Sequence, residues 1–264
     1  MQIVRFLNAD GRIGYGEPSG PNLAREISGD IFGSFEVSND EQEVAKRLAP
    51  VDPPNVLCIG LNYKAHAEES GAKFPEAPVI FIKATTTITA PGAPIILPRS
   101  APDEVDYECE LAIVIGKRAH RVSEADSLDY VLGYTCANDV SARDCQLRLD
   151  AQWARGKSFD TFCPLGPHLV TADEVDGDHL RVRTILNGKV MQDSSTEDMI
   201  FSCRQVISYL SHQFTLLPGT VICTGTPSGV GFARKPPVYL KPGDEVTIDI
   251  EGIGQLTNPV IADR

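Results

Sequence analysis

Long apolar runs are missing from the sequence, and the longest are short stretches such as residues 111–115. Because a membrane-spanning helix needs about 20 apolar residues, no such helix is expected. The first residues reach Asn8, Asp10 and Gly11 without a basic segment followed by an apolar core. We therefore expect neither a secretory signal peptide nor a membrane partner.

Paired cysteine motifs are also absent. The seven cysteines form no Cys-x-x-Cys pair, and their spacing relative to the histidines does not fit a zinc site. Their number is odd, and most lie among apolar neighbours, as Cys58 does between Leu57 and Ile59. We expect reduced, buried thiols, which are typical of a cytoplasmic protein.

Runs of Lys and Arg do not occur, and the formal net charge at pH 7 is −12. Such an average charge repels a polyanion such as DNA, so no nucleic-acid partner is expected. An acidic protein can still bind a small acid, but it then needs a metal ion or a focused basic pocket.

The chain has 264 residues, of which 42% are hydrophobic and 23% charged, and it can therefore bury a sizeable core. A proline-rich linker at residues 49–54 is the best domain boundary. We expect a small N-terminal domain over residues 1–50, with a hairpin at residues 1–16 and a short helix at residues 41–48. The main domain then covers residues 51–264.

Short strands dominate the main domain. Helices are predicted at residues 63–70, 142–149 and 202–214, and a helical start precedes the strand that ends at residue 138. Further strands are predicted at residues 56–59, 79–83, 107–115, 181–186, 189–192, 221–224 and 245–250. Asn187-Gly188 is the strongest hairpin signal. The fold class is therefore mainly β with some α (α+β).

Carboxylates alternate along the strand predicted at residues 107–115. Asp106, Glu108 and Glu110 are spaced to share one face of it, and three carboxylates repel one another unless a cation lies between them. The alternative is a solvated strand face. Asp139 follows the next strand and can bring a further oxygen ligand to the same place, which favours a hard cation such as Mg²⁺.

His66 and Glu69 lie three residues apart in the predicted helix at residues 63–70, hence on one face. Histidine can act as a base near neutral pH, and a carboxylate partner raises its basicity. The alternative is a surface helix with a lone histidine, and Glu68 could take the place of Glu69. Residues 71–75, which begin with Gly71, could hinge a lid.

Arg143 and Gln146 are also three apart and could address a carboxylate together, while Lys157 follows at some distance. Taken singly, each is better explained as an ordinary surface residue. A glycine-rich segment at residues 225–231, which includes Gly225 and Thr226, lacks the ending of a phosphate-binding loop. It could approach a small ligand through its backbone or form a tight structural turn.

Six segments together resemble the fumarylacetoacetate hydrolase superfamily over residues 56–260. They stand in family order, and each is modest alone: Gly-Leu-Asn-Tyr at 60–63 with His66, Phe-Ile-Lys at 81–83, Tyr-Glu-Cys-Glu-Leu-Ala at 107–112, Asn-Asp-Val-Ser-Ala-Arg-Asp at 138–144, Gly-Lys-Ser-Phe-Asp at 156–160, and Gly-Thr-Pro-Ser-Gly-Val-Gly at 225–231.

The resemblance implies a rolled mixed β-sandwich as the catalytic domain and a homodimer. It implies that Glu108, Glu110 and Asp139 bind Mg²⁺ or Mn²⁺, with Asp106 a bystander. It further implies that Lys157, Arg143, Gln146 and Thr226 of the Gly225 loop contact the substrate, and that His66 with Glu69 activates water on a mobile lid.

The activity implied is that of a metal-dependent enzyme acting on a small 2-oxo acid, foremost hydrolysis of a C–C bond in an acylpyruvate-like or fumarylacetoacetate-like substrate. Alternatives are oxaloacetate decarboxylation or tautomerisation, hydroxyheptadienedioate isomerisation, ureidoglycolate lysis, and a metal-binding module without turnover. Acylpyruvase-like members often carry Arg just before the Asn-Tyr pair, where this chain has Leu61. This difference weighs against acylpyruvate as the substrate.

Overall fold

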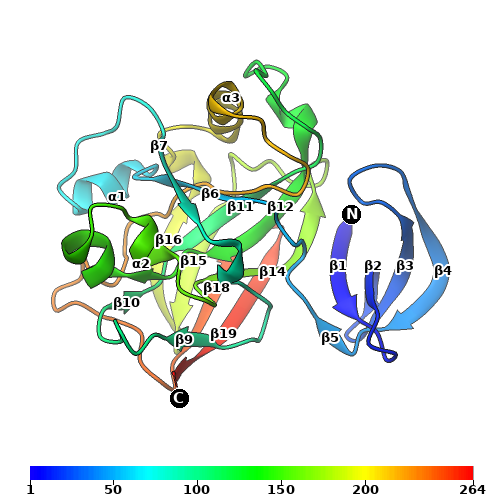
Figure 1. Cartoon of the computed structure of the whole chain (residues 1–264), viewed down its shortest axis with the longest axis horizontal. Coiled ribbons are helices and arrows are strands. Elements are labelled where there is room, and N and C mark those ends of the chain that lie inside the picture. Colours follow the sequence, from blue (N-terminus) through cyan, green and yellow to red (C-terminus); the bar gives the residue numbers. More distant parts are fainter. Residues whose placement is uncertain (264) are drawn as a thin grey trace.

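The chain folds mainly into strands, and the structure, a computed structural model, describes residues 1–263 (Figure 1). One large sheet has the order β4-β3-β2-β1-β14-β12-β11-β17-β6-β7, with β5 attached to β1 and β8 to β14. Its strands are β1 Gln2–Leu7, β2 Ile13–Gly20, β3 Leu23–Gly29, β4 Phe35–Glu43, β5 Lys46–Arg47, β6 Val56–Gly60, β7 Val79–Lys83, β8 Ile88–Thr89, β11 Cys109–Ile115, β12 Val131–Asn138, β14 Cys163–Thr171 and β17 Val221–Cys223.

A second sheet packs against the middle of the first. Its order is β16-β15-β18-β19-β9, and a separate pair is formed by β10 and β13. These strands are β9 Ile95–Leu97, β10 Val105–Asp106, β13 Ser141–Ala142, β15 Arg181–Leu186, β16 Lys189–Ser195, β18 Glu245–Ile250 and β19 Gly254–Ala262. The expectation of a mainly β fold with some α is thus confirmed.

Helices are short and lie outside the sheets. They are α1 Lys64–Glu69, α2 Ala154–Lys157, α3 Cys203–Gln213, the 3-10 turns η1 Thr85–Thr87, η2 Ser127–Tyr130 and η4 Thr196–Asp198, and the π-helix η3 Cys145–Leu149. Helix α3 begins with a capping box in which Ser202 and Gln205 satisfy each other's backbone amides. Within residues 1–263, no helix has the length and apolar character that crossing a membrane requires.

The main core lies between the two sheets. Leu111 and Ile113 of β11 pack there with Ile248 and Ile250 of β18, and helix α3 covers one end. All seven residues of β11 are buried, because this strand has neighbours on both edges and on both faces. A central strand of this kind is a rigid support for the side chains at its start, Glu108 and Glu110.

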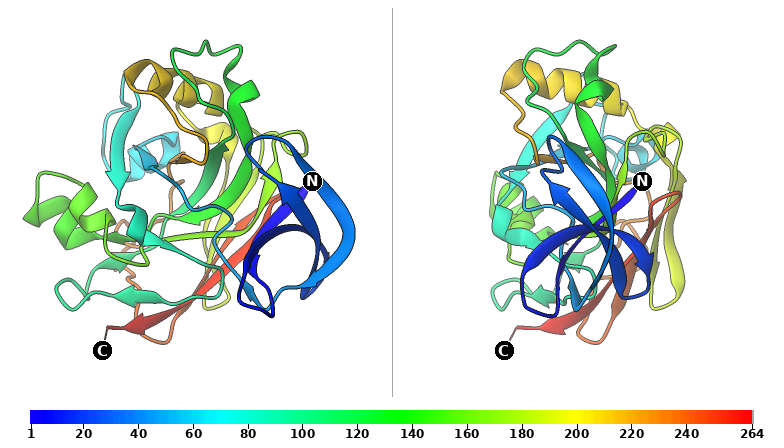
Figure 2. Two further views of the ribbon diagram at one scale, coloured as in Figure 1. Left: turned by 45° about the vertical axis from the view of Figure 1, so that its right-hand side comes forward. Right: turned by 90° about the vertical axis from the view of Figure 1, so that its right-hand side faces the viewer.

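The N-terminal strands β1–β4 form a separate curl of the large sheet (Figure 2). Only Gln2 and Ile3 of β1 pair with β14 of the main body. The helix expected at residues 41–48 is wrong: this segment completes β4 and forms β5. Pairing with β3 and β1 there supplies backbone hydrogen bonds that outweigh the helical preference of these residues, because an isolated helix this short is only marginally stable.

Two further expectations need correction. Asp106 belongs to β10, where it pairs with Ser141, and β11 begins only at Cys109, so the three carboxylates do not alternate along one strand. Residues 142–149 do not form one α-helix, because Ala142 pairs with Val105 and the turns that follow form η3. The hairpin at Asn187-Gly188 is confirmed, with φ of 51° and 78°. All seven cysteines are free and buried, as expected.

Candidate active site

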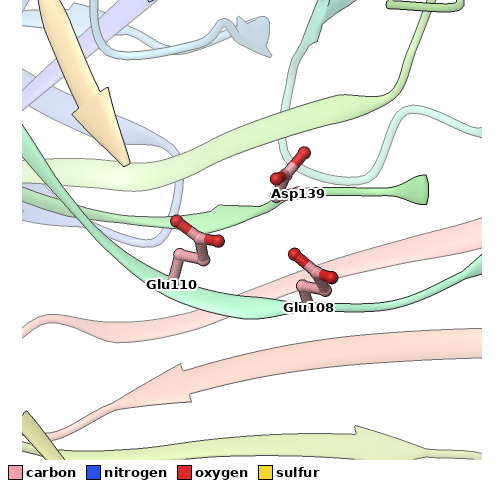
Figure 3. A group of neighbouring side chains, drawn as sticks. All are labelled: Glu108, Glu110 and Asp139. Carbon is pink, nitrogen blue, oxygen red and sulfur yellow. The ribbon is translucent and has the colours of Figure 1, made fainter. Parts of the chain in front are cut away.

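Three carboxylates meet where β11 starts and β12 ends. The two strands are antiparallel, and Cys109 pairs with Asn138, so Glu108 and Glu110 lie beside Asp139. Figure 3 shows the three side chains turned toward one another from these neighbouring segments. One oxygen of each lies within 4.8 Å of the others. The chain therefore brings together the oxygen ligands that hard divalent cations prefer.

This acidic triad (Glu108, Glu110 and Asp139) is buried, with 5%, 2% and 0% of each residue exposed. A solvated strand face is therefore excluded. Three buried carboxylates without compensating charge would be strongly unfavourable, so the surrounding cations are needed to account for them, and a divalent metal would add to this compensation. The geometry and the donor type fit Mg²⁺ or Mn²⁺.

Neighbouring charges make the two glutamates unequal. Burial alone would raise the pKa of Glu108, but Lys157 and Arg143 lower that pKa to about 2. Burial raises the pKa of Glu110 well above its usual value, and the charges of Asp139 and Glu108 raise it further. Without a metal, burial and these neighbouring charges therefore favour the neutral form of Glu110 and the ionised form of Glu108.

Two buried lysines balance the triad. The Nζ of Lys157 lies 2.7 Å from Glu108 and 2.6 Å from Asp139, and the carboxylates raise the pKa of this amine although burial opposes them. Lys83, at the end of β7, binds the other oxygen of Asp139 and also donates to the carbonyl of Val140 at 3.3 Å. Asp139 is thus held from two sides, which fixes its orientation toward the glutamates.

Arg143 connects the triad to Asp106. Its Nη1 lies 2.7 Å from Glu108 and donates to Gln146 at 2.8 Å, while its Nε donates to Asp106 at 3.0 Å. Asp106 is not a bystander in the fold, since it also accepts the backbone amides of Gly231 and Phe232 at 2.8 and 3.0 Å. Arg143 is therefore oriented by a carboxylate outside the triad.

The glycine-rich loop at residues 225–231 is bound by carboxylates along its length. Glu110 accepts the amide of Gly225 at 2.8 Å, and Asp106 accepts that of Gly231. A Cβ at Gly231 would collide with the carbonyl of Val238 and with Asp106, so only glycine allows this contact. Thr226 is held by Gln192, whose amide nitrogen donates to its hydroxyl at 2.9 Å. The loop thus forms a tight structural turn, and its approach to a small ligand stays a prediction.

His66 and Glu69 form a dyad on α1. The Nδ1 of His66 lies 2.8 Å from Glu69, whose two oxygens also accept the amide of Gly229 at 3.0 and 2.9 Å. With the proton on Nδ1, this contact leaves Nε2 as the basic nitrogen. Glu68 makes no side-chain hydrogen bond within residues 1–263, so Glu69 is the partner of His66.

One cavity of about 240 Å³ joins these groups, and Glu108, Glu110, His66, Arg143, Gln146, Lys157 and Thr226 line it. Glu69 and Asp139 lie immediately behind it, bonded to His66 and Lys157. A larger surface cavity of about 740 Å³ near the C-terminus contains none of these residues. The sequence analysis assigned no role to Lys83, which contacts Asp139, to Gln192, which binds Thr226, or to Trp153, which lines the cavity. Of these, only Lys83 could have been noticed in the sequence, because a lysine at the end of an apolar strand is unusual.

The chain belongs to the fumarylacetoacetate hydrolase family. The family described as fumarylacetoacetate (FAA) hydrolase C-terminal matches residues 55–261. A mitochondrial oxaloacetate tautomerase of Rattus norvegicus is 48% identical over 216 residues, which cover 81% of this chain and 69% of that protein.

Two solved structures are similar over the whole chain. A 2-hydroxyhepta-2,4-diene-1,7-dioate isomerase of Mycobacterium marinum superposes with a TM-score of 0.87 at 42% identity, covering 100% of this chain and 99% of that one. A 5-carboxymethyl-2-hydroxymuconate delta-isomerase of Mycobacterium smegmatis superposes with a TM-score of 0.88 at 42% identity, covering 100% of both chains. The chain is accordingly an enzyme of this family. The homodimer and the cytoplasmic location stay predictions.

The first prediction separates metal binding from folding. Glu110→Gln should abolish metal affinity but barely change the free energy of unfolding without metal, because the raised pKa of Glu110 favours its neutral form there. Glu108→Gln should also abolish metal affinity, and it should destabilise the fold by about 1–3 kcal/mol, since Lys157 and Arg143 each lose one of their two carboxylate partners. Calorimetry with Mn²⁺ and urea unfolding measure the two quantities, with the surface variant Glu124→Gln as control. If both variants bind Mn²⁺ with wild-type affinity, the triad is not the metal site.

The second prediction concerns pH. Glu110 must lose its proton before it can act as a ligand, so metal binding should release a proton, and metal affinity should rise with pH until Glu110 is ionised in the free protein. Calorimetry in buffers of different ionisation enthalpy counts the proton. Equal heats in all buffers would show that Glu110 is ionised without metal.

The third prediction concerns the contact between α1 and the glycine-rich loop. Glu69→Ala removes the acceptor of both His66 and the Gly229 amide, so hydrogen exchange should speed up at residues 64–75 and 227–231. Glu68→Ala, one residue away, is the matched control and should leave exchange as in the wild type. Identical exchange in the two variants would mean that Glu69 does not hold these segments together.

Proposed function

We propose that this chain is a divalent-metal-dependent keto–enol tautomerase of small 2-oxo acids, with oxaloacetate as the first substrate to test. The observation that carries the proposal is that a His–carboxylate dyad and an oxygen-rich metal triad border one small cavity. Tautomerisation needs a base that moves one proton between carbon and oxygen and a site that tolerates negative charge on that oxygen. Both requirements are matched here.

The metal's contribution is electrostatic: a bound divalent cation supplies Lewis-acid stabilisation of negative charge on the oxygens of a 2-oxo acid. His66 takes or returns the proton at C3 through Nε2, and Glu69 fixes the ring and stabilises its charged form. Lys157 adds a second positive charge beside the triad, and burial strengthens its effect.

The sequence favoured C–C hydrolysis. The names of the similar proteins support tautomerisation instead. The rat relative is named an oxaloacetate tautomerase, and both superposed structures are named isomerases. Hydrolysis of an acylpyruvate is the second candidate, because the same dyad could activate a water molecule. Hydrolysis would need a water molecule positioned to attack the substrate as well as a group that carries a proton.

The fourth prediction tests the dyad. With Mg²⁺, the wild-type protein should convert enol to keto oxaloacetate at a higher rate than it hydrolyses acetylpyruvate. Ultraviolet absorbance measures the rate of tautomerisation. His66→Ala should lower the tautomerisation rate by about 10²–10⁴-fold, the usual contribution of a positioned base, while metal affinity stays intact.

A matched control exists on the surface. His179 also contacts a carboxylate three residues away, at 2.8 Å from Asp176, but it lies outside the cavity. His179→Ala should therefore leave the rate unchanged. If His66→Ala also keeps the rate within a few-fold of wild type, His66 is not the base. If acetylpyruvate is the faster substrate, hydrolysis is the main activity.

A further inference from the structure

The cavity has a charged floor and an apolar wall, and the proposed tautomerase chemistry uses only the floor. Glu108, Glu110, Arg143 and Lys157 form the charged floor. The apolar wall is formed by Leu61, Phe81, Leu147, Trp153 and Phe232. None of these five can carry a proton or a metal, so their presence beside the reacting groups needs another account.

Trp153 is seated firmly in this wall. Its indole ring lies directly on the backbone of Gly60, where an added Cβ would collide with it. Phe81 contacts the indole edge-on, with ring centroids 5.8 Å apart. Held from two sides, Trp153 presents a fixed aromatic surface to the cavity.

The apolar wall adjoins the reacting groups. The Nζ of Lys157, which contacts Glu108 and Asp139, lies 5.2 Å from the centre of the Phe81 ring. On the other side, Phe232 lies under the Arg143 guanidinium at 4.5 Å and beside His66. If a 2-oxo acid binds at the triad, a group attached to its C3 would therefore extend from the charged floor toward apolar side chains.

The cations of the cavity are already paired. Among the described residues that line it, Arg143 contacts Asp106 and Glu108, and Lys157 contacts Glu108 and Asp139. A second carboxylate on the substrate would meet no unpaired positive charge at the wall. The wall thus favours an uncharged tail.

Leu61 and Leu147 are held in unfavourable states at the wall. Leu61 has φ of 53°, a left-handed conformation that costs a branched residue about 1 kcal/mol or more. Leu147 leaves 49% of its surface exposed at the cavity. An apolar ligand would cover the exposed side chain of Leu147 and so gain binding free energy.

We propose, building on the tautomerase function above, that the site also takes monoanionic 2-oxo acids with an aromatic group on C3, that is, arylpyruvates, and interconverts their enol and keto forms. In the enol-to-keto direction the O–H bond at C2 breaks, C2=O forms, and the electron pair of the C2=C3 bond takes up a proton at C3. One proton leaves and one is added, so no oxidant or co-reactant is needed.

The test compares phenylpyruvate with oxaloacetate in the same Mg²⁺-loaded protein, starting from each enol. Wild type should accelerate both reactions. Trp153→Ala should lower the ratio of kcat/KM for phenylpyruvate over oxaloacetate by about tenfold or more, as expected for losing one buried aromatic contact. Leu61→Arg should lower the same ratio by adding a free cation that suits the dianion.

Ile82→Ala is the matched control, because Ile82 neighbours Phe81 on β7 and is 58% exposed but does not line the cavity. It should leave the ratio unchanged. Turnover of oxaloacetate without acceleration of phenylpyruvate would overturn the arylpyruvate proposal and leave the proposed function standing. Failure with both substrates would overturn the proposed function itself. An unchanged ratio in Trp153→Ala, with the fold intact by circular dichroism, would show that the wall does not bind the aromatic group.

Discussion

Repulsion among three buried carboxylates is the constraint on which the rest of this structure depends. Glu108, Glu110 and Asp139 converge where two central strands meet, and their charge must be balanced in a medium that screens little. Lys157 and Lys83 supply part of the balance, and the raised pKa of Glu110 favours its neutral form when no metal is bound. The oxygen donors of the triad fit a divalent cation, whose charge would supply the rest of the balance.

The same carboxylates organise the backbone around them. Glu110 and Asp106 accept amides at the two ends of the glycine-rich loop, and Glu69 accepts one from its middle. The loop, the dyad on α1 and the triad, which lies where β11 starts and β12 ends, are thus parts of one hydrogen-bond network. Glu110 connects the triad directly to the loop through the amide of Gly225.

Local patterns in the sequence were sufficient for much of this. Alternating carboxylates, the spacing of His66 and Glu69, and the order of six motifs identified the triad, the dyad and the family. The predictions that were wrong depended on partners distant in the chain. Residues 41–48 form strands because β3 and β1 lie beside them, and Asp106 lies outside the predicted strand because β10 pairs with β13. Lys83 and the Trp153 wall were missed for the same reason, since their importance comes from neighbours that only the fold brings together.

Three residues of the apolar wall differ from Glu110 in one further respect. Leu61 lies in a turn, Leu147 in a π-helix and Trp153 in a connecting segment, whereas Glu110 belongs to a strand that is buried throughout. Substitutions in such peripheral segments cost little stability, so they can accumulate by neutral drift while the metal ligands stay fixed. Descendants of one ancestral enzyme could in this way come to use different acids without rebuilding the chemistry.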